Sequence, residues 1–486
     1  MIVQNCAINS IAPYQDSPSA PWNDQRVAHL YRRLGFGATY AEIQAGLAMN
    51  PGDLVDQLLD TAAGLPSPSP FFWSNYTMQD YEDNGMTDDV FDHYEQLERR
   101  WLQEMITEGV RSKFALFWHG HFVTALEVYG CSAYMWAYYV LLHDQAFGNF
   151  KTFVEDMGKT GAMLSYLNGN VNVEGEPNEN YARELMELFT MGANNGYTQT
   201  DIVNVARALT GWKADDYQCT EVDFASWDFD DGQKTIFGQQ GNWDYDDVHD
   251  LIFTVRQNQV AFYICSEIYK YFVYPEVNED IVNALADTFK SNNWELMPVF
   301  KQLFKSEHFF DITLAGAHIK SPLELFAGLY KISELEYPSD YNEDILGSMI
   351  YDAGNLGQQL FNPPNVSGWD GHRAWINENT LTNRWSSAGG FIYAFSDEAR
   401  NRLRETVLVG VANSNDPVVI TQFISRFYMN RDLELQHLDV AVQYLKADIP
   451  QNYFDDGSWS LYWDEAPDQI VNLLIYLSRL PEFQMV

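Results

Sequence analysis

The residues best suited to chemistry lie in the stretch 177–212, which predicts two helices joined by a short Gly/Asn turn. At about 100° per residue, apolar side chains cover one side of the first helix and a polar arc lies opposite. That arc consists of Asn180, Arg183, Glu184 and Glu187. Two carboxylates three residues apart could hold a metal ion or divide the roles of acid and base, with Asn178 lining the same cleft. The alternative is a solvated face with an Arg183–Glu187 ion pair.

Two histidines, His119 and His121, form a His-x-His sequence that would chelate a metal ion if it lay on a strand. The surrounding segment is densely apolar and helical, however, and residues two apart on a helix lie about 200° apart. Only one of the pair can therefore serve a given site unless Gly120 breaks the helix. The alternative is that both are core histidines, which need buried hydrogen-bond partners. A carboxylate from the first helix of 177–212 is the partner that we expect.

Other polar residues stand in apolar or rigid surroundings. Arg207 interrupts an apolar helix face, so we expect it either to pair with one of those two glutamates or to bind an anion. Lys320 directly precedes a helix start, and its role is open between structure and catalysis. The Pro-rich loop 362–369 holds Asn365 and Trp369. Rigid loops of this kind either shape binding sites or buttress cores.

Helical patterns dominate the chain and predict a mainly α fold, a large multi-helical unit with long loops. Thr39 with Glu42, and Ser321 with Glu324, have the spacing of capping boxes and predict helix starts.

The same patterns predict how the chain is divided. Residues 213–248 are rich in Asp, Trp and Gly and predict a small irregular or β-like insertion. Residues 64–90 predict a long surface loop. We expect an irregular lead-in at 1–22 and a single unit over 23–486, within which 400–486 could form a C-terminal helical subdomain.

The composition limits the classes of function. The net charge of −39 argues against nucleic acid and anionic membranes as partners, because phosphates would be repelled. No apolar run reaches the ~18–20 residues that span a bilayer, and the N-terminal residues lack the features of a signal peptide. No Cys-x-x-Cys pair is present, and Cys131 and Cys265 are predicted to be buried thiols. The local signatures of serine hydrolases, P-loop NTPases, Rossmann folds and zincins are absent from the sequence.

Several motifs occur together in a characteristic order. They are HLYRRLGFGAT (29–39), FALFWHGHF (114–122), NENYARELMELFTMG (178–192), YTQTDIVNVARALTGW (197–212), IKSPLEL (319–325) and LFNPPNVSGWDGHRAWIN (360–377). As a set they resemble the bacterial family called domain of unknown function 1800. The resemblance implies an exported protein. It also implies a functional partner from the family called domain of unknown function 1501, which is similar to sulfatases and phosphatases.

The resemblance also implies which positions matter. The positions that the family favours include His119, His121, Asn178, Asn180, Arg183, Glu184, Glu187, Lys320, Asn365, Trp369 and Arg384. This chain departs from many relatives at two places, where Phe189 and Phe229 stand instead of histidine. A metal site that required those two histidines would be incomplete here.

Taken together, these observations predict an exported enzyme with a polar cleft, a hydrolase that a divalent metal ion could assist. The predicted catalytic residues are Glu184, Glu187, His121, Arg183, Arg207 and Lys320. The predicted substrate-binding residues are Asn178, Asn180, Asn365, Trp369 and Arg384, and the predicted metal ligands are His119, His121, Glu184 and Glu187. The alternative is a non-catalytic secreted partner, or a carbohydrate-binding or scaffold protein whose 14 Trp and 29 Tyr could stack on sugars.

Overall fold

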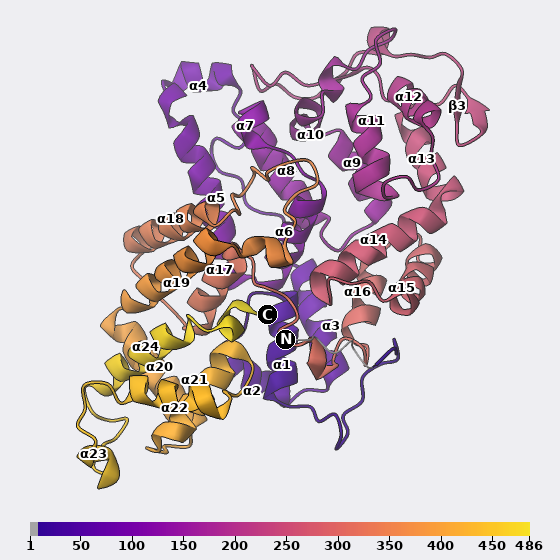
Figure 1. Cartoon of the computed structure of the whole chain (residues 1–486). Helices are drawn as coiled ribbons and strands as arrows, with labels where there is room; N and C mark the ends of the chain where they lie inside the picture. The colour runs from indigo at the N-terminus through magenta and orange to yellow at the C-terminus, as the bar shows by residue number, and fades with distance from the viewer. Residues whose placement is uncertain (1–7) are drawn as a thin grey trace.

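The computed structural model of the protein describes residues 8–486 and is mainly α-helical, which confirms the predicted fold class (Figure 1). The first helices are α1 (Asp24–Leu34), α2 (Tyr40–Leu47), α3 (Pro51–Ala63), α4 (Met78–Asn84), α5 (Val90–Thr107), α6 (Val110–His121), α7 (Leu126–Tyr129), α8 (Ser132–Asp144), α9 (Phe150–Gly158), α10 (Gly161–Tyr166), α11 (Asn180–Glu184) and α12 (Gln199–Ala208). The later helices are α13 (Tyr245–Val255), α14 (Gln257–Phe272), α15 (Glu279–Ser291), α16 (Leu296–Phe304), α17 (Pro322–Ile332), α18 (Ser339–Asn355), α19 (Glu378–Tyr393), α20 (Asp397–Gly410), α21 (Pro417–Met429), α22 (Leu435–Leu445), α23 (Asn452–Asp455) and α24 (Ala466–Leu477).

A small β insertion follows α12, as the composition of 213–248 predicts. Strand β1 (Trp212–Lys213) pairs antiparallel with β2 (Asp223–Phe224), and β3 (Lys234–Ile236) pairs antiparallel with β4 (Gln239–Gly241). The surface stretch 64–90 differs from its prediction as one long loop, because α4 lies within it. Thr77 and Asp80 form a capping box at the start of that helix.

Helix α6 lies at the centre of the fold, in contact with α1, α3, α5 and α8 (Figure 1). Every residue from Val110 to His119 is buried. Phe114 packs on the rings of Phe272 in α14 and Phe300 in α16, at 4.6 and 4.7 Å between ring centroids. Charged residues on α6 are therefore buried with it, and each needs a partner inside the protein.

The 177–212 stretch forms two helices joined by a Gly/Asn turn, as predicted, but the first is not a regular α-helix. After α11 the chain continues as a π-helix, Leu185–Thr190. The Thr190 hydroxyl donates to the Leu185 carbonyl at 2.5 Å, and the Met191 N–H donates to the Met186 carbonyl at 3.1 Å. Wider helical turns of this kind are rare, and they occur frequently at functional sites.

Both predicted capping boxes are present. The Thr39 hydroxyl accepts from the Glu42 N–H at the start of α2, and Glu42 accepts from the Thr39 N–H in return. Ser321 and Glu324 do the same at the start of α17. The side chain of Glu324 is thus fixed in place by its own helix start.

The described part of the lead-in, residues 8–22, is irregular and lies against the fold. The Tyr14 N–H donates to the Lys305 carbonyl at 2.7 Å, and its ring packs on Trp22 and Phe310. Residues 1–7 of the predicted lead-in lie outside the described residues. At the other end, α24 packs on α19, α20 and α22. Across residues 8–486, no helix combines the length and apolar character needed to cross a membrane.

A disulfide joins Cys131, which precedes α8, to Cys219 in the β insertion, with 5.7 Å between their Cα atoms. The prediction of a buried free thiol is wrong for Cys131, because the insertion folds back over the start of α8. The prediction is confirmed for Cys265, which is buried and unpaired. Burial raises the pKa of the Cys265 thiol above its ordinary value.

Cys219→Ser is expected to lower the free energy of unfolding by about 2–4 kcal/mol, because the unfolded chain regains the freedom of a loop of 88 residues. Urea unfolding measures this difference. Wild-type protein in reductant should unfold at the same urea concentration as Cys219→Ser. Cys265→Ser is the matched control, and it should keep the response to reductant. Equal midpoints for wild type with and without reductant would contradict the prediction.

Candidate active site

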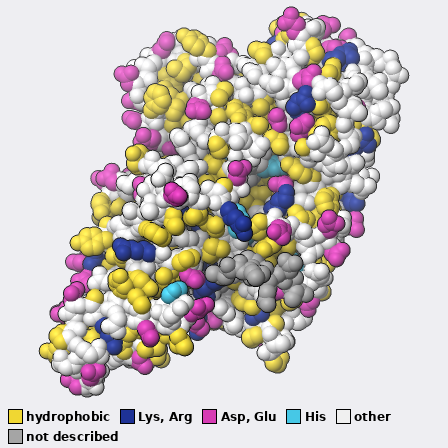
Figure 2. Space-filling view, in the orientation of Figure 1, with side chains coloured by type: hydrophobic (Ala, Val, Ile, Leu, Met, Phe, Trp, Pro, Cys, Tyr) yellow, Lys and Arg dark blue, Asp and Glu magenta, His cyan; other side chains and the backbone are white. Residues whose placement is uncertain are grey.

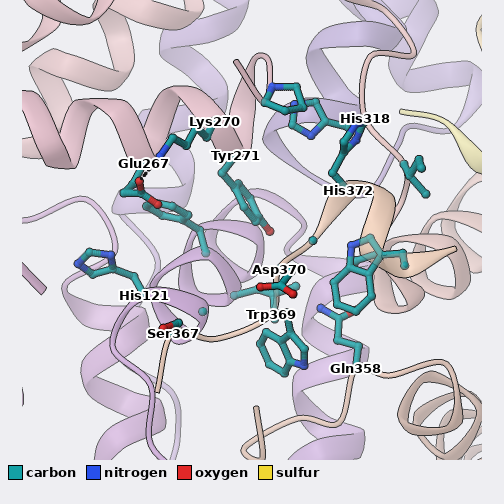
Figure 3. A pocket seen from close by; sticks show the side chains of 18 of the residues that line it. His121, Glu267, Lys270, Tyr271, His318, Gln358, Ser367, Trp369, Asp370 and His372 are labelled. Atoms are coloured by element: carbon teal, nitrogen blue, oxygen red, sulfur yellow. Dashed lines mark hydrogen bonds and ion pairs between the residues drawn. The ribbon is translucent and has the colours of Figure 1, made fainter. Parts of the chain in front are cut away.

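A cavity of about 320 Å³ lies beside the end of α6. Its walls come from segments far apart in the sequence: α1, α6, the π-helix, α14, the start of α17 and the loop 358–375. Figure 3 shows the side chains that surround it, with His121 across the cavity from His318 and His372 in this view. In Figure 2, basic and histidine side chains meet near the middle of the face shown, whereas acidic ones are scattered across all of it.

Helix α14 supplies the polar wall of the cavity. Tyr263, Glu267, Lys270 and Tyr271 follow one another at helical spacing and share one face of the helix. Lys270 donates to Glu267 at 2.7 Å (Figure 3). A cation and an anion therefore stand side by side at this wall.

His121 is the last residue of α6, and it meets the π-helix. Its Nε2–H donates to the Phe189 carbonyl at 3.1 Å, and the Tyr263 hydroxyl donates to the Leu188 carbonyl at 3.0 Å. Burial lowers the pKa of His121, although the Phe189 carbonyl and Glu267 oppose that shift. The predicted carboxylate partner is therefore corrected to a backbone carbonyl, which the end of the π-helix leaves available.

His318 and His372 stand side by side at the inner wall, with 5.7 Å between their ring centroids (Figure 3). The Nε2 atom of His318 and the Nδ1 atom of His372 are buried and have no hydrogen-bond partner. Burial lowers the pKa of His318 well below its ordinary value, the charges of Arg33 and Lys113 add to the shift, and the Val273 carbonyl opposes it. Burial and nearby arginines lower the pKa of His372 too. Both imidazoles are thus neutral at pH 7.

Backbone contacts and backbone conformation fix the positions of these two histidines. His318 exchanges two hydrogen bonds with the C-terminal residue Val486, at 2.8 and 3.2 Å. His372 has φ of +45°, a left-handed conformation that side chains other than glycine adopt rarely. Strain of this kind concentrates at binding and catalytic sites.

The loop that carries His372 is positioned by two glycines in contact. Gly368 has φ of +78°, and a Cβ atom there would lie 2.4 Å from the Gly120 carbonyl oxygen on α6. Only glycine lets the loop approach the helix so closely. The next residue, Trp369, packs its ring on His119 at 5.3 Å between centroids and lines the cavity.

Beneath the histidines lies a buried group of charges. The Lys113 ammonium of α6 donates to Glu324, whose other carboxylate oxygen accepts from the Ser321 N–H at 2.6 Å. Burial alone would raise the pKa of Glu324, but Lys113, the Ser321 N–H and Arg33 hold it below its ordinary value. Arg33 and Glu324 line the cavity, so this charge group forms its floor.

The family described as Protein of unknown function (DUF1800) matches residues 29–485, nearly the whole chain. The chain belongs to the DUF1800 family. No curated protein and no solved structure matches it.

Five of the six motifs that resemble the DUF1800 family contribute side chains to the cavity. The contributing residues include Arg33, Phe117, His121, Leu188, Ser321, Glu324, Trp369 and His372. The motif 197–212 is the exception, because α12 packs on α11 and β3 instead.

Among the predicted site residues of this DUF1800 chain, His121 and Trp369 line the cavity. His119 lies two residues earlier on α6, toward the opposite side of the helix, and is fully buried. Its Nε2 accepts from the Phe361 N–H at 3.1 Å, and its Nδ1–H donates to the Tyr138 hydroxyl at 2.7 Å. Burial lowers the pKa of His119 to about 3. Both ring nitrogens of this histidine are therefore used inside the core.

Glu184 and Glu187 lie on the outer side of their helix and do not line the cavity. Arg183 bonds to Glu179 at 3.0 Å and to Glu187 at 3.5 Å, which matches the alternative of a solvated ion-pair face. Burial raises the pKa of Glu184, and the charge of Glu187 raises it further.

The predicted amide ligands also serve the backbone. The Asn178 side chain accepts from the Asn180 N–H at 3.0 Å, and Asn180 itself is exposed. The Asn365 side chain accepts from the Ser367 N–H at 2.8 Å and fixes the turn of its loop.

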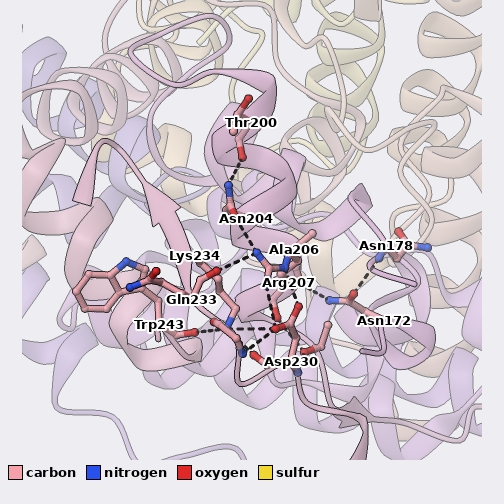
Figure 4. A network of polar contacts seen from close by, with 12 residues as sticks. Asn172, Asn178, Thr200, Asn204, Ala206, Arg207, Asp230, Gln233, Lys234 and Trp243 are labelled. Atoms are coloured by element: carbon pink, nitrogen blue, oxygen red, sulfur yellow. Dashed lines mark hydrogen bonds and ion pairs between the residues drawn. The ribbon is translucent and has the colours of Figure 1, made fainter. Parts of the chain in front are cut away.

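Arg207 pairs with Asp230 in the β insertion, through two hydrogen bonds of 2.7 and 3.1 Å (Figure 4). The prediction of a pair with Glu184 or Glu187 is therefore corrected. Asp230 directly follows Phe229, one of the two positions where the chain departs from many relatives. Lys234 donates to the Asp230 carbonyl at 2.5 Å, so this network clamps the insertion onto α12.

Lys320 and Arg384 are buried beside the charge group rather than in the cavity. Lys320 donates to the Phe483 carbonyl at 2.7 Å, and Arg384 donates to the Lys320 carbonyl at 3.1 Å. Burial lowers the pKa of Arg384 to about 10 and that of Lys320 well below its ordinary value.

The predicted metal ligands are not gathered into one site. Throughout residues 8–486, no three His, Cys, Asp or Glu side chains are placed to hold a metal ion. The physical reason is that His119 faces the core, His121 faces a carbonyl, and both glutamates face outward.

The cavity residues that the sequence did not single out include Arg33, Glu267, Lys270, Tyr271, His318, Asp370 and His372. One signal was available for α14, since Tyr263, Glu267 and Lys270 form a polar stripe on an apolar helix. Another was that His372 stands inside a motif used for the family resemblance, and His318 immediately precedes one.

Proposed function

We propose that this protein is an enzyme that hydrolyses a small organic substrate inside the cavity by general acid–base chemistry. The observation that supports it is the pair His318 and His372, each with a buried ring nitrogen that has no partner. Such nitrogens cost stability unless they are used, and unpaired titratable groups in a cavity are typical of active sites.

In the proposed reaction His372 is the general base. Its neutral imidazole takes a proton from a water molecule as the water oxygen bonds to the electrophilic centre of the substrate. The bond to the leaving group breaks, and the leaving group takes a proton from the imidazolium or from Lys270, which stands at the wall. A metal-assisted route has less support, because the described residues offer no three-ligand set.

Export from the cytoplasm is also part of the proposal. The Cys131–Cys219 disulfide supports it, because disulfides persist in oxidising compartments such as the periplasm. A member of the domain of unknown function 1501 family remains the partner that we propose.

The test is a panel of p-nitrophenyl esters, phosphates, sulfates and glycosides, assayed with wild type and variants. His372→Gln is expected to lower kcat/KM for any substrate that is turned over by about 10²–10⁴-fold. In wild type, activity should fall on the acid side below pH ~6.5, because the base must be neutral and its pKa is lowered. Arg207 lies outside the cavity, so Arg207→Gln is the control. Turnover by His372→Gln at the wild-type rate would contradict the proposal.

One observation favours the alternative of a carbohydrate-binding protein. Trp369, Trp375, Tyr263 and Tyr271 line the cavity, and aromatic rings stack on sugars. Binding of an oligosaccharide without any turnover across the panel would support this alternative over the enzyme.

A further inference from the structure

Four buried cations surround a single carboxylate, Glu324. They are Arg33, Lys113, Lys320 and Arg384, whose exposed fractions are 4%, 2%, 8% and 0%. Glu324 is the carboxylate that opposes the charges of all four. In a protein of net charge −39, a buried excess of positive charge at one point is costly and requires an explanation.

Backbone carbonyls accept hydrogen bonds from three of these cations but do not balance their charge. Lys320 bonds to the Phe483 carbonyl, Arg384 bonds to the Lys320 carbonyl, and Arg33 donates to the Val273 carbonyl at 2.6 Å. A carbonyl is a dipole without net charge, so Glu324 supplies the full negative charge that faces these four side chains.

The excess charge reaches the cavity at Arg33. This side chain lines the cavity, and its Nε–H is buried without a hydrogen-bond partner. His318 faces the same Val273 carbonyl that Arg33 bonds, which places the imidazole and the guanidinium next to each other. Both residues line the cavity, where they form what we call its inner end, and Arg33 Nε and His318 Nε2 are each buried without a hydrogen-bond partner.

We propose that this inner end binds the carboxylate group of the substrate, held by Arg33 Nε and His318 Nε2. A carboxylate there supplies the missing negative charge and satisfies both orphan nitrogens, and charge-assisted bonds of this kind are strong. A phosphate would need more donors than these two, because the Ser321 N–H at the start of α17 is already used by Glu324. The aromatic side chains Trp369 and Trp375 contact the body of the ligand, and His372 is left free to act as base.

The inference names the substrate class of the proposed enzyme and so rests on the proposed function. Binding is measured without turnover, however, so each can fail alone. Carboxylate binding with no hydrolysis would contradict the proposed function and support the binding site. Hydrolysis of uncharged substrates with no carboxylate binding would contradict the binding site and support the proposed function.

The test is isothermal titration of wild-type protein with benzoate, phenyl phosphate and benzyl alcohol. Benzoate should bind at least about tenfold more tightly than the uncharged alcohol, as expected for one charge-assisted hydrogen bond. It should also bind more tightly than phenyl phosphate. Benzoate binding should be accompanied by proton uptake, seen as a dependence of the measured heat on the buffer, because a nearby anion raises the pKa of His318.

Variants then locate the site. Arg33→Gln should weaken the binding of benzoate at least about tenfold and leave the affinity for benzyl alcohol unchanged. If Arg33→Gln does not fold, His318→Gln is the second variant, and it should abolish the proton uptake. Lys159→Gln, at an exposed Lys–Asp pair outside the cavity, is the control. Equal affinity for benzoate and benzyl alcohol, preference for phenyl phosphate, or unchanged benzoate binding in a folded Arg33→Gln protein would overturn the proposal.

Discussion

Glu324→Gln is expected to lower the free energy of unfolding by about 3–5 kcal/mol, because it removes the charge of a buried ion pair and keeps its shape. The carboxylate accepts from Lys113 and from the Ser321 N–H. The side chains of Lys113 and Glu324 are only 3% and 14% exposed, so water cannot take the place of the lost charge. Urea unfolding, followed by circular dichroism, measures the difference.

The matched control is Glu179→Gln, which removes the same charge from the Arg183–Glu179 pair at the surface. Its partners are 36% and 35% exposed, so the loss should stay below about 1 kcal/mol. The double variant Lys113→Met with Glu324→Gln should recover part of the stability, since no unpaired charge then remains on α6. Equal losses for Glu324→Gln and Glu179→Gln would show that the buried pair contributes no more than a solvated one.

The fold could be predicted from the sequence because its signals are local. The capping boxes at Thr39 and Ser321 lie within four residues of their helices, and each is present in the structure. The composition of 213–248 was enough to predict the small β insertion. The disulfide was not predicted because it is not a local feature. Cys131 and Cys219 are 88 residues apart, and nothing near either one indicates the pair.

The candidate site could be predicted only in part, because it is built by contacts between distant segments. His121 and Trp369 were found, since each stands out within its own segment. Arg33 and His318 are brought together by the Val273 carbonyl, which no local pattern reveals.

Glu184 and Glu187 were predicted to lie in the site but do not line the cavity. Helical spacing places both residues on one face correctly, but it does not say whether that face meets water or a cavity. The π-helix adds a second reason, because its carbonyls, rather than its carboxylates, meet His121 and Tyr263.

Acid is expected to destabilise the protein strongly through four buried histidines. Burial lowers the pKa of His29, His119 and His143 to about 3 and that of His249 to about 4. In the unfolded chain each imidazole takes up its proton near pH ~6.5. Below that pH the unfolded state binds more protons, so stability falls as the pH falls, by about 2 kcal/mol per histidine between pH ~7 and ~5.

One carboxyl works in the opposite direction. Burial and the charge of Glu95 raise the pKa of Glu98 to about 8. The folded state therefore holds this proton at neutral pH while the unfolded state does not. Acidification from pH ~7 to ~5 raises the contribution of Glu98 to the free energy of unfolding by about 2–3 kcal/mol. The destabilisation by the four histidines is larger than the stabilisation by Glu98. The free energy of unfolding is therefore expected to fall by several kcal/mol between pH ~7 and ~5.

Urea unfolding at a series of pH values between ~5 and ~7 tests this expectation, and two variants at one contact separate titration from packing. His119→Gln removes a titrating group, so its stability should depend less on pH than that of wild type, by about 2 kcal/mol over the interval. Tyr138→Phe removes the hydroxyl that bonds His119 but leaves the imidazole in place. It should lower stability by about 1–3 kcal/mol at every pH while keeping most of the wild-type pH dependence. If His119→Gln kept the full wild-type dependence of stability on pH, another side chain would have to be the one that takes up the proton on unfolding. The buried neutral state of His119 would then be disproved.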